Sequence, residues 1–118
     1  MAKFWTLEVY NFMTASPLVP VFYHEDVETA KAVTKACYVG GVRAFEFTNR
    51  GDFAHETFCE LSKWADKECP ELALGIGSIV DPATAAIFLQ MGANFVVGPM
   101  LNAEIFKTCN RRQVAYIP

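Results

Sequence analysis

The chain has 118 residues, 53% of them hydrophobic and 19% charged, with a formal net charge of −3. This is the length of one ordinary domain, and the composition supports a hydrophobic core and excludes an intrinsically disordered chain. The acidic balance argues against nucleic-acid binding, and no apolar run approaches the length that spans a bilayer. Because the amino terminus also lacks a secretory signal, we expect a cytoplasmic protein with no nucleic-acid or membrane partner.

The first third of the chain predicts a helix, a strand and a second helix. Apolar residues at helical spacing predict an amphipathic helix over residues 3–15, with a buried face formed by Phe4, Leu7, Val9, Tyr10 and Met13. Ser16-Pro17 ends this helix, and the apolar residues 18–23 predict a short strand. Asp26 is the expected N-cap of a helix that continues to about Tyr38.

The middle of the chain predicts two further strands with a helix between them. Gly40-Gly41 turns the chain into a strand that contains Glu46. The next helix is expected over residues 53–67, with Phe58, Leu61, Trp64 and Ala65 buried and Pro70 ending it. Residues 72–76 form the third expected strand, which Gly77-Ser78 closes.

Two more helices and two more strands complete the pattern. Asp81-Pro82 supplies an N-cap followed by a proline at the first position of a helix that ends at Gly92. Residues 94–97 form a strand, Asn102 caps a helix to about Asn110, and residues 114–117 begin a fifth strand.

Strands and helices therefore alternate strictly, which predicts right-handed crossovers and a parallel sheet within a single domain, residues 1–118. The strands are not uniformly apolar, whereas an open sheet covered on both faces would require this. We therefore expect an α/β fold in which helices lie outside a mixed interior, as in a partial (β/α)8 TIM-type barrel of five strands. A complete barrel needs eight strands and ~200 residues or more, so the domain is expected to be a truncated barrel.

The strand around Glu46 carries the strongest functional signal. Alternation places Ala44, Glu46 and Thr48 on one face, with Phe45 and Phe47 on the other. A carboxylate among aromatic residues is costly to bury unless a partner or a function uses it. Arg50 follows at the carboxyl end of the strand, where α/β folds bind their ligands. A purely structural ion pair of Glu46 with Arg43 or Arg50 is the alternative.

Other candidate sites are weaker. The four cysteines have no CxxC spacing and are interpreted as free thiols. His24-Glu25-Asp26 resembles a metal cluster, but neighbouring residues on a loop diverge, so no metal site is expected. Gly75-x-Gly77 lacks the third glycine and the acidic residue of a dinucleotide loop.

The segment Gly40-Gly41-Val42-Arg43-x-x-Glu46-x-Thr48-x-Arg50 resembles the second-strand motif of the 2-keto-3-deoxy-6-phosphogluconate / 4-hydroxy-2-oxoglutarate aldolases. Weaker similarities follow in the family's order: Pro20-Val21, Pro70-Glu71-Leu72 running into Gly75-Ile76-Gly77-Ser78, the segment 92–99 and Tyr116-Ile117-Pro118. The resemblance covers residues 18–118.

The resemblance implies a (β/α)8 barrel, usually a homotrimer, that cleaves a 2-keto acid to pyruvate and an aldehyde through a lysine Schiff base, without a cofactor. It implies that Glu46 moves protons, and that Arg50 holds the pyruvate carboxylate. Ser78 stands where the family usually has threonine, Pro99 would shape the pocket wall, and Thr48 would add a hydroxyl for substrate binding.

The lysines depart from the family pattern, because the Schiff-base lysine of the family lies on the sixth strand. The six lysines are all expected on helices or at their ends: Lys3, Lys31, Lys35, Lys63, Lys67 and Lys107. We therefore expect the 118-residue chain alone to be inactive as an aldolase, with the keto acid it takes left open. A non-catalytic half-barrel that binds or assembles through its open strand edges is the alternative, as is a truncated chain.

Overall fold

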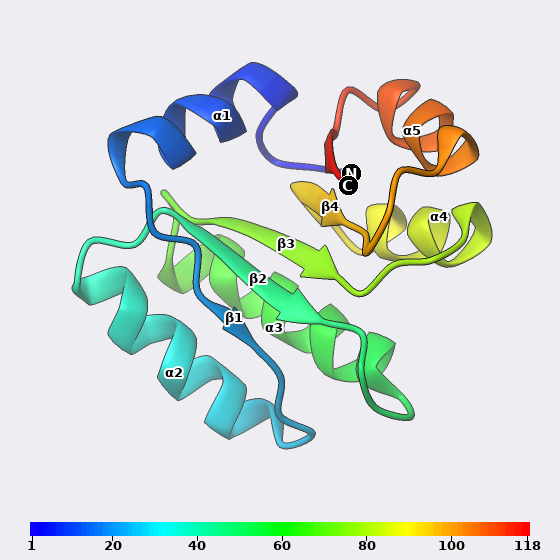
Figure 1. Cartoon of the computed structure of the whole chain (residues 1–118). Coiled ribbons are helices and arrows are strands. Elements are labelled where there is room, and N and C mark those ends of the chain that lie inside the picture. The colour runs from blue at the N-terminus through cyan, green and yellow to red at the C-terminus, as the bar shows by residue number, and fades with distance from the viewer.

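The computed structural model describes all residues from Met1 to Pro118 and contains one parallel sheet with the strand order β1-β2-β3-β4-β5. Helices alternate with the strands (Figure 1). In chain order the elements are α1 (Thr6–Ala15), β1 (Val21–Phe22), α2 (Val27–Val39), β2 (Ala44–Thr48), α3 (Ala54–Glu68), β3 (Ala73–Gly77), α4 (Pro82–Gln90), β4 (Phe95–Val97), α5 (Ala103–Asn110) and β5 (Ala115–Ile117). The predicted order of elements is confirmed.

The three predicted N-caps are confirmed, and they explain where α2, α4 and α5 begin. The Asp26 carboxylate accepts a hydrogen bond from the Thr29 amide at 2.9 Å, and that of Asp81 accepts one from the Thr84 amide at 2.8 Å. The Asn102 side chain accepts hydrogen bonds from the first backbone amides of α5. Each cap satisfies donors that the first helical turn otherwise leaves unpaired.

Helix α1 begins later than the sequence predicts, at Thr6 instead of residue 3. The Asn94 side-chain oxygen accepts hydrogen bonds from the amides of Lys3 and Phe4 at 2.9 and 3.0 Å, which holds this segment outside the helix. The Glu8 carboxylate then accepts the Trp5 amide at 2.8 Å and so closes the helix start.

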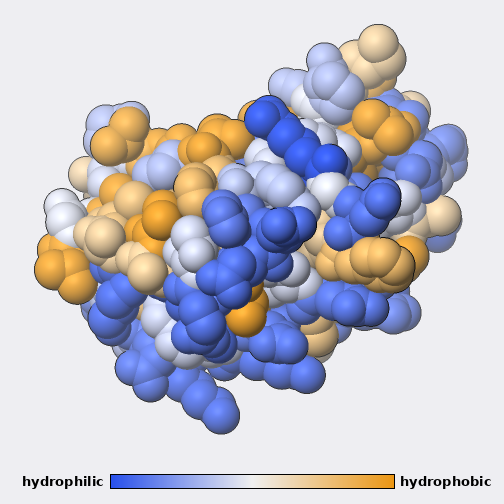
Figure 2. Space-filling model, turned by 90° about the horizontal axis from the view of Figure 1, so that it is seen from below, coloured by the Kyte–Doolittle hydropathy of each residue, from blue (hydrophilic) through white to orange (hydrophobic).

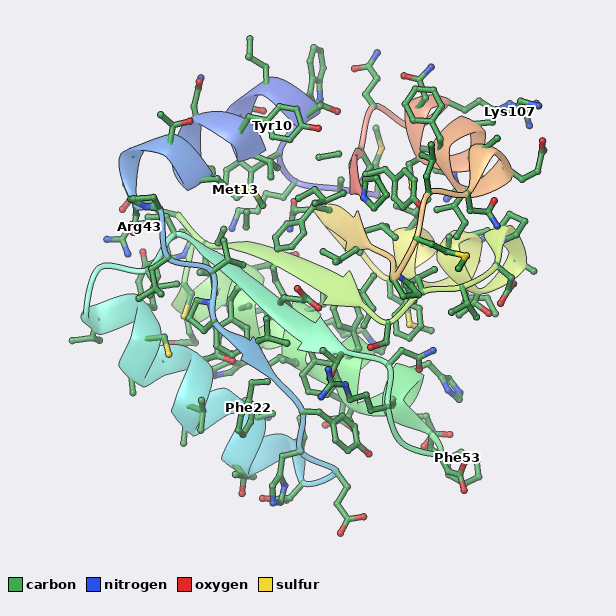
Figure 3. All side chains as sticks on the ribbon, viewed as in Figure 1. Tyr10, Met13, Phe22, Arg43, Phe53 and Lys107 are labelled. Atoms are coloured by element: carbon green, nitrogen blue, oxygen red, sulfur yellow. The ribbon has the colours of Figure 1, made fainter.

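The predicted buried face of α1 is only partly correct. Val9 is fully buried, and Met13 points from α1 toward the sheet (Figure 3), but Leu7 is 71% exposed and Tyr10 is 42% exposed. Figure 1 shows the reason, because α1 lies alone across one side of the sheet while α2 and α3 lie on the other. A helix without neighbouring helices buries only the narrow stripe that faces the strands.

The sheet has two chemically different faces, as the alternation in β2 predicts. Phe45, Phe47 and Ile76 belong to the large core between the sheet and the row of helices α2 to α5. On the opposite face, which we call the inner face, a small cluster contains Val9, Ala44, Ala73, Phe95 and Ala115. Helix α1 thus covers the inner face near the amino ends of the strands, because Ala44, Ala73 and Ala115 each begin a strand.

The edges of the sheet are β1 and β5. β1 is shorter than the predicted residues 18–23, because pairing with β2 is limited to Val21 and Phe22. The surface seen from below in Figure 2 is hydrophilic over much of its area, with hydrophobic residues gathered toward its margins. None of the helices combines the length and the apolar character required to cross a membrane.

Candidate active site

Glu46 lies on the inner face of β2, between β1 and β3. Its register partners are Val21 on β1 and Gly75 on β3. The residue is only 9% exposed, and Phe45 and Phe47 on either side of it point into the core beneath the helices. The predicted separation of faces is therefore confirmed: the acid lies on the inner face of the sheet, away from helices α2 to α5.

The Glu46 carboxylate has no protein partner that would explain its burial. Burial raises the pKa of Glu46 above its ordinary value of 4.5, and the positive charge of Arg50 lowers it to a smaller extent. None of the salt bridges in the structure includes Glu46. An unpaired carboxyl group with a raised pKa is typical of a group that donates and accepts protons.

Arg43 and Arg50 have different roles. Arg43, at the amino end of β2 (Figure 3), donates hydrogen bonds to the carbonyl groups of Tyr38 and Val42 at 3.0 and 2.9 Å. Its Nε atom lies 3.9 Å from the Glu71 carboxylate. Arg43 is thus held away from Glu46, so a structural ion pair between these two residues is excluded. Arg50 is exposed at the other end of the strand and takes part in no salt bridge.

The turn after β2 holds Arg50 at the rim of the sheet. The Arg50 amide donates a hydrogen bond to the Thr48 carbonyl at 3.0 Å, which forms a tight turn directly after the strand. The Asn49 amide donates to the Gly77 carbonyl at 2.9 Å and so extends the pairing of β2 and β3 into this turn. A Cβ atom at Gly51, just beyond, would overlap the Tyr23 hydroxyl group, so a larger residue there would displace the Tyr23 side chain.

Thr48 is the second unsatisfied polar group on this strand. It is 1% exposed, and its hydroxyl oxygen has no hydrogen-bond partner. It lies two positions after Glu46, so strand alternation places both on the same face. Buried hydroxyl groups are usually hydrogen-bonded, and Thr34 on α2 is the other buried side chain that lacks a partner.

Ser78 and Pro99 follow the carboxyl ends of β3 and β4, so they lie at the same end of the strands as Arg50. Ser78 has a φ angle of +62°, a left-handed conformation that non-glycine residues rarely adopt and that often occurs at functional sites. Pro99 is exposed and lines a cavity of about 180 Å³ together with Ile79, Val80, Met100, Asn102 and Ile105. The fold therefore places Thr48, Arg50, Ser78 and Pro99 at the carboxyl ends of their strands, with Glu46 in the middle of β2.

Tyr116 on β5 holds a loop at this end of the strands, a role that the sequence did not predict. Its hydroxyl group donates a hydrogen bond to the Met100 carbonyl at 3.0 Å and accepts one from the Asn102 amide at 3.1 Å. It thereby fixes the loop that carries Pro99 against β5. No local signal distinguishes this tyrosine from a simple core aromatic, because its partners lie 14 and 16 residues earlier in the chain.

The remaining candidates from the sequence do not form sites. His24 and Asp26 serve the start of α2, where the Asp26 amide donates to the His24 Nδ1 atom at 3.0 Å. No group of three or more potential metal ligands occurs. The four cysteines are free, and burial raises the pKa of Cys69 and raises that of Cys109 to about 11. Both of these thiols therefore stay protonated and unreactive near neutral pH.

A second cavity, of about 490 Å³, lies away from the candidate site. Its walls combine the amino-terminal residues Met1, Ala2 and Trp5 with Leu89 of α4 and the segment 111–114. Residues 111–114 precede β5, so this cavity lies at the amino ends of the strands. Glu46, Arg50 and Ser78 lie toward the carboxyl ends, and the volume of the cavity alone does not make it the active site.

One sheet of parallel strands that alternate with helices defines a partial α/β barrel of the TIM type. The family model "KDPG and KHG aldolase" matches residues 9–118. The chain therefore belongs to the KDPG and KHG aldolase family.

Relatives and solved structures agree with this assignment. The KHG/KDPG aldolase of Escherichia coli K12 is 30% identical over 116 residues, which are 98% of this chain and 53% of the relative. A 2-dehydro-3-deoxy-phosphogluconate aldolase of Dickeya dadantii gives the same values. The crystal structure of the Zymomonas mobilis 2-keto-3-deoxy-6-phosphogluconate aldolase is 26% identical with a TM-score of 0.79, covering 96% of this chain and 52% of that one. The chain thus spans about half the length of these relatives.

Proposed function

We propose that this chain is the part of a class I aldolase that supplies the proton-transfer and carboxylate-binding groups. The enzyme cleaves a 2-keto acid, such as 2-keto-3-deoxy-6-phosphogluconate or 4-hydroxy-2-oxoglutarate, to pyruvate and an aldehyde. The observation that carries the proposal is the buried, unpaired Glu46 carboxylate, which lies on the inner face of the sheet, with Arg50 just beyond the carboxyl end of β2.

Each residue then has a chemical role. When a carbon–carbon bond breaks next to a Schiff base, the electron pair is left on an enamine carbon, which must be protonated. Glu46 carries this proton, since burial raises its pKa and so favours the protonated form of the carboxyl group. The Arg50 guanidinium binds the keto-acid carboxylate through two parallel hydrogen bonds. Thr48 and Ser78 offer hydroxyl groups to the substrate oxygens, and Pro99 forms part of the pocket wall.

The Schiff-base lysine comes from outside residues 1–118. Lys31 and Lys107 pair with Glu28 and Glu104 on their own helices, both at 2.8 Å. Lys35 donates a hydrogen bond to the Glu68 carbonyl on the helical side of the sheet. The other three lysines also lie outside the strands. The chain incubated with pyruvate and borohydride is therefore expected to gain no covalent adduct. A stable adduct on these 118 residues would refute this assignment.

The role of Glu46 is tested in the full-length enzyme that contains these residues. The Glu46→Gln variant is expected to lose about 10²- to 10⁴-fold in kcat, the usual contribution of a general acid–base group. Glu56→Gln is the matched control, because Glu56 is an exposed acid in the first turn of α3. Equal rates for the Glu46→Gln variant and the unmodified enzyme would remove Glu46 from the mechanism.

A half-barrel that acts by assembly is the second candidate function, and the two unpaired sheet edges favour it. Strands β1 and β5 each have one side without a hydrogen-bonded neighbour, and Val21 on β1 is 54% exposed. Such edges are templates for pairing with another chain. Light scattering of the 118-residue protein tests this candidate: self-association supports it, and a well-folded monomer counts against it. For the complete enzyme we infer a homotrimer, as the resemblance implies.

A further inference from the structure

The space occupied by the Glu46 carboxyl group is created by a missing side chain on the next strand. A Cβ atom built on Gly77 would overlap the Glu46 Oε1 atom and would lie 2.5 Å from the Cδ atom and 3.0 Å from the Cγ atom. No other residue is among the three nearest neighbours of that position. Any side chain at residue 77 therefore competes with the Glu46 carboxyl group for one volume.

The strand register shows the direction in which the carboxyl group points. The partner of Glu46 across β2 and β3 is Gly75, whereas Gly77 pairs with Thr48. Glu46 thus reaches diagonally, two residues toward the carboxyl end of β3, instead of standing opposite its own partner. This orientation brings the Glu46 carboxyl group closer to the carboxyl ends of β2 and β3, where Thr48, Arg50 and Ser78 lie.

Backbone geometry gives no other reason for a glycine at position 77. Gly41 and Gly92 have positive φ angles, which favour glycine, but Gly77 does not. Gly77 is also the last residue of a regular strand. Glycine weakens a strand, so its presence there often marks a close approach by another group. The observed close contact is the Glu46 side chain.

Gly75 provides a natural comparison within the same strand. It lies on the same face as Gly77, but a Cβ atom at residue 75 would overlap the ring of Phe95. Phe95 is fully buried in the small inner cluster, and Glu46 is not among the three nearest neighbours of that position. The two glycines of β3 thus accommodate two different side chains. Gly75 leaves space for the Phe95 ring, and Gly77 leaves space for the Glu46 carboxyl group.

We propose that Gly77 is a positioning residue for Glu46. The absence of a side chain at residue 77 directs the Glu46 carboxyl group toward the carboxyl ends of the strands. The catalytic meaning of this placement rests on the proposed function. The placement itself is a property of the 118-residue chain and is testable without turnover.

Carboxyl ¹³C NMR of the protein labelled at glutamate measures the placement directly. In the Gly77→Ala variant, the added methyl group displaces the flexible carboxyl end of Glu46 toward water, so its resonance moves and its pKa falls toward 4.5. In Gly75→Ala, the Phe95 ring takes the strain and the Glu46 signal moves less. The proposal is overturned if Gly77→Ala leaves the Glu46 resonance and pKa unchanged, or if Gly75→Ala changes them equally.

A double-mutant cycle covers the case in which Gly77→Ala alone does not fold. The loss of stability caused by Gly77→Ala is expected to shrink in a Glu46→Ala background, because the competing side chain is gone. Recovery of folding in the double variant also supports the proposal. The same loss in both backgrounds, or a double variant as unfolded as Gly77→Ala alone, would overturn it.

Kinetics of the full-length enzyme separate this inference from the proposed function. Gly77→Ala is expected to lower kcat with little change in KM, because it misplaces a proton-transfer group without touching the carboxylate clamp. If Glu46→Gln is fully active, the proposed function fails, while the NMR titration and the cycle still decide whether Gly77 places the acid.

Discussion

Arg50 lowers the pKa of Glu46 without forming a salt bridge with it. Burial acts in the opposite direction and more strongly, so the pKa of Glu46 stays above 4.5. Because Arg50 is exposed and its guanidinium is not paired with the acid, it remains available for a second carboxylate. The two residues thus interact through their charges without a direct contact.

Removing the Arg50 charge is expected to raise the pKa of Glu46 further, since the ionised form loses its stabilising neighbour. An NMR titration of the Arg50→Gln variant measures this change. Arg111→Gln is the control, because Arg111 lies in the turn before β5 at the opposite end of the strands. A Glu46 pKa that does not change in Arg50→Gln, or rises equally in both variants, contradicts the prediction.

The raised pKa of Glu46 also predicts how its stability contribution depends on pH. The folded chain binds this proton more tightly than the unfolded chain, so the stabilising contribution is present below 4.5 and is lost as pH rises through the folded pKa. Glu46→Gln is therefore expected to gain stability relative to the unmodified protein between about pH 4 and about pH 8. Urea unfolding at both values measures the difference, with Glu56→Gln as the exposed control. The same stability difference at the two values would contradict this assignment.

The Tyr116 hydroxyl group is expected to stabilise the loop after β4. Tyr116→Phe removes the hydrogen bonds to the Met100 carbonyl and from the Asn102 amide, which is expected to cost about 0.5–1.5 kcal/mol, the net contribution of an ordinary hydrogen bond. Tyr10→Phe is the control, because Tyr10 is exposed on α1 and its change is expected to stay within about 0.5 kcal/mol. Chemical denaturation measures both variants, and equal effects would show that the hydroxyl bridge has no stabilising role.

Helix α1 is expected to be anchored by Val9 and not by Leu7. Val9→Ala removes two fully buried methyl groups and is expected to cost about 1.5 kcal/mol, at ~0.8 kcal/mol for each group. Leu7→Ala removes more atoms from a side chain that is already in water, so its effect should stay below about 0.5 kcal/mol. Denaturant midpoints of the two variants provide the measurement. A larger loss for Leu7→Ala would restore the wider buried face that the helical spacing alone indicates.

Local signals predicted the order of the elements because capping, turn and alternation patterns act over a few residues. Asp26, Asp81 and Asn102 cap the helices that their positions indicate. Alternation in β2 was sufficient to separate Glu46 from Phe45 and Phe47, because a strand turns each successive side chain to the opposite face.

The start of α1 could not be read from the sequence, because it depends on a partner far along the chain. Asn94 holds the amides of Lys3 and Phe4 from a distance of 91 and 90 residues. The exposure of Leu7 and Tyr10 has a similar origin, since helical spacing identifies an apolar stripe but not how much of it finds a surface to cover.

The sequence by itself therefore determined a parallel β/α chain with an acid on one face of its second strand and an arginine at that strand's end. Only the tertiary structure decided that Arg43 is held elsewhere, that Thr48 has no partner and that the Glu46 carboxyl group occupies the space above Gly77. The physical reason is that a strand pattern fixes which way a side chain points. The groups that it meets there come from neighbouring strands, whose register is set by the folded sheet.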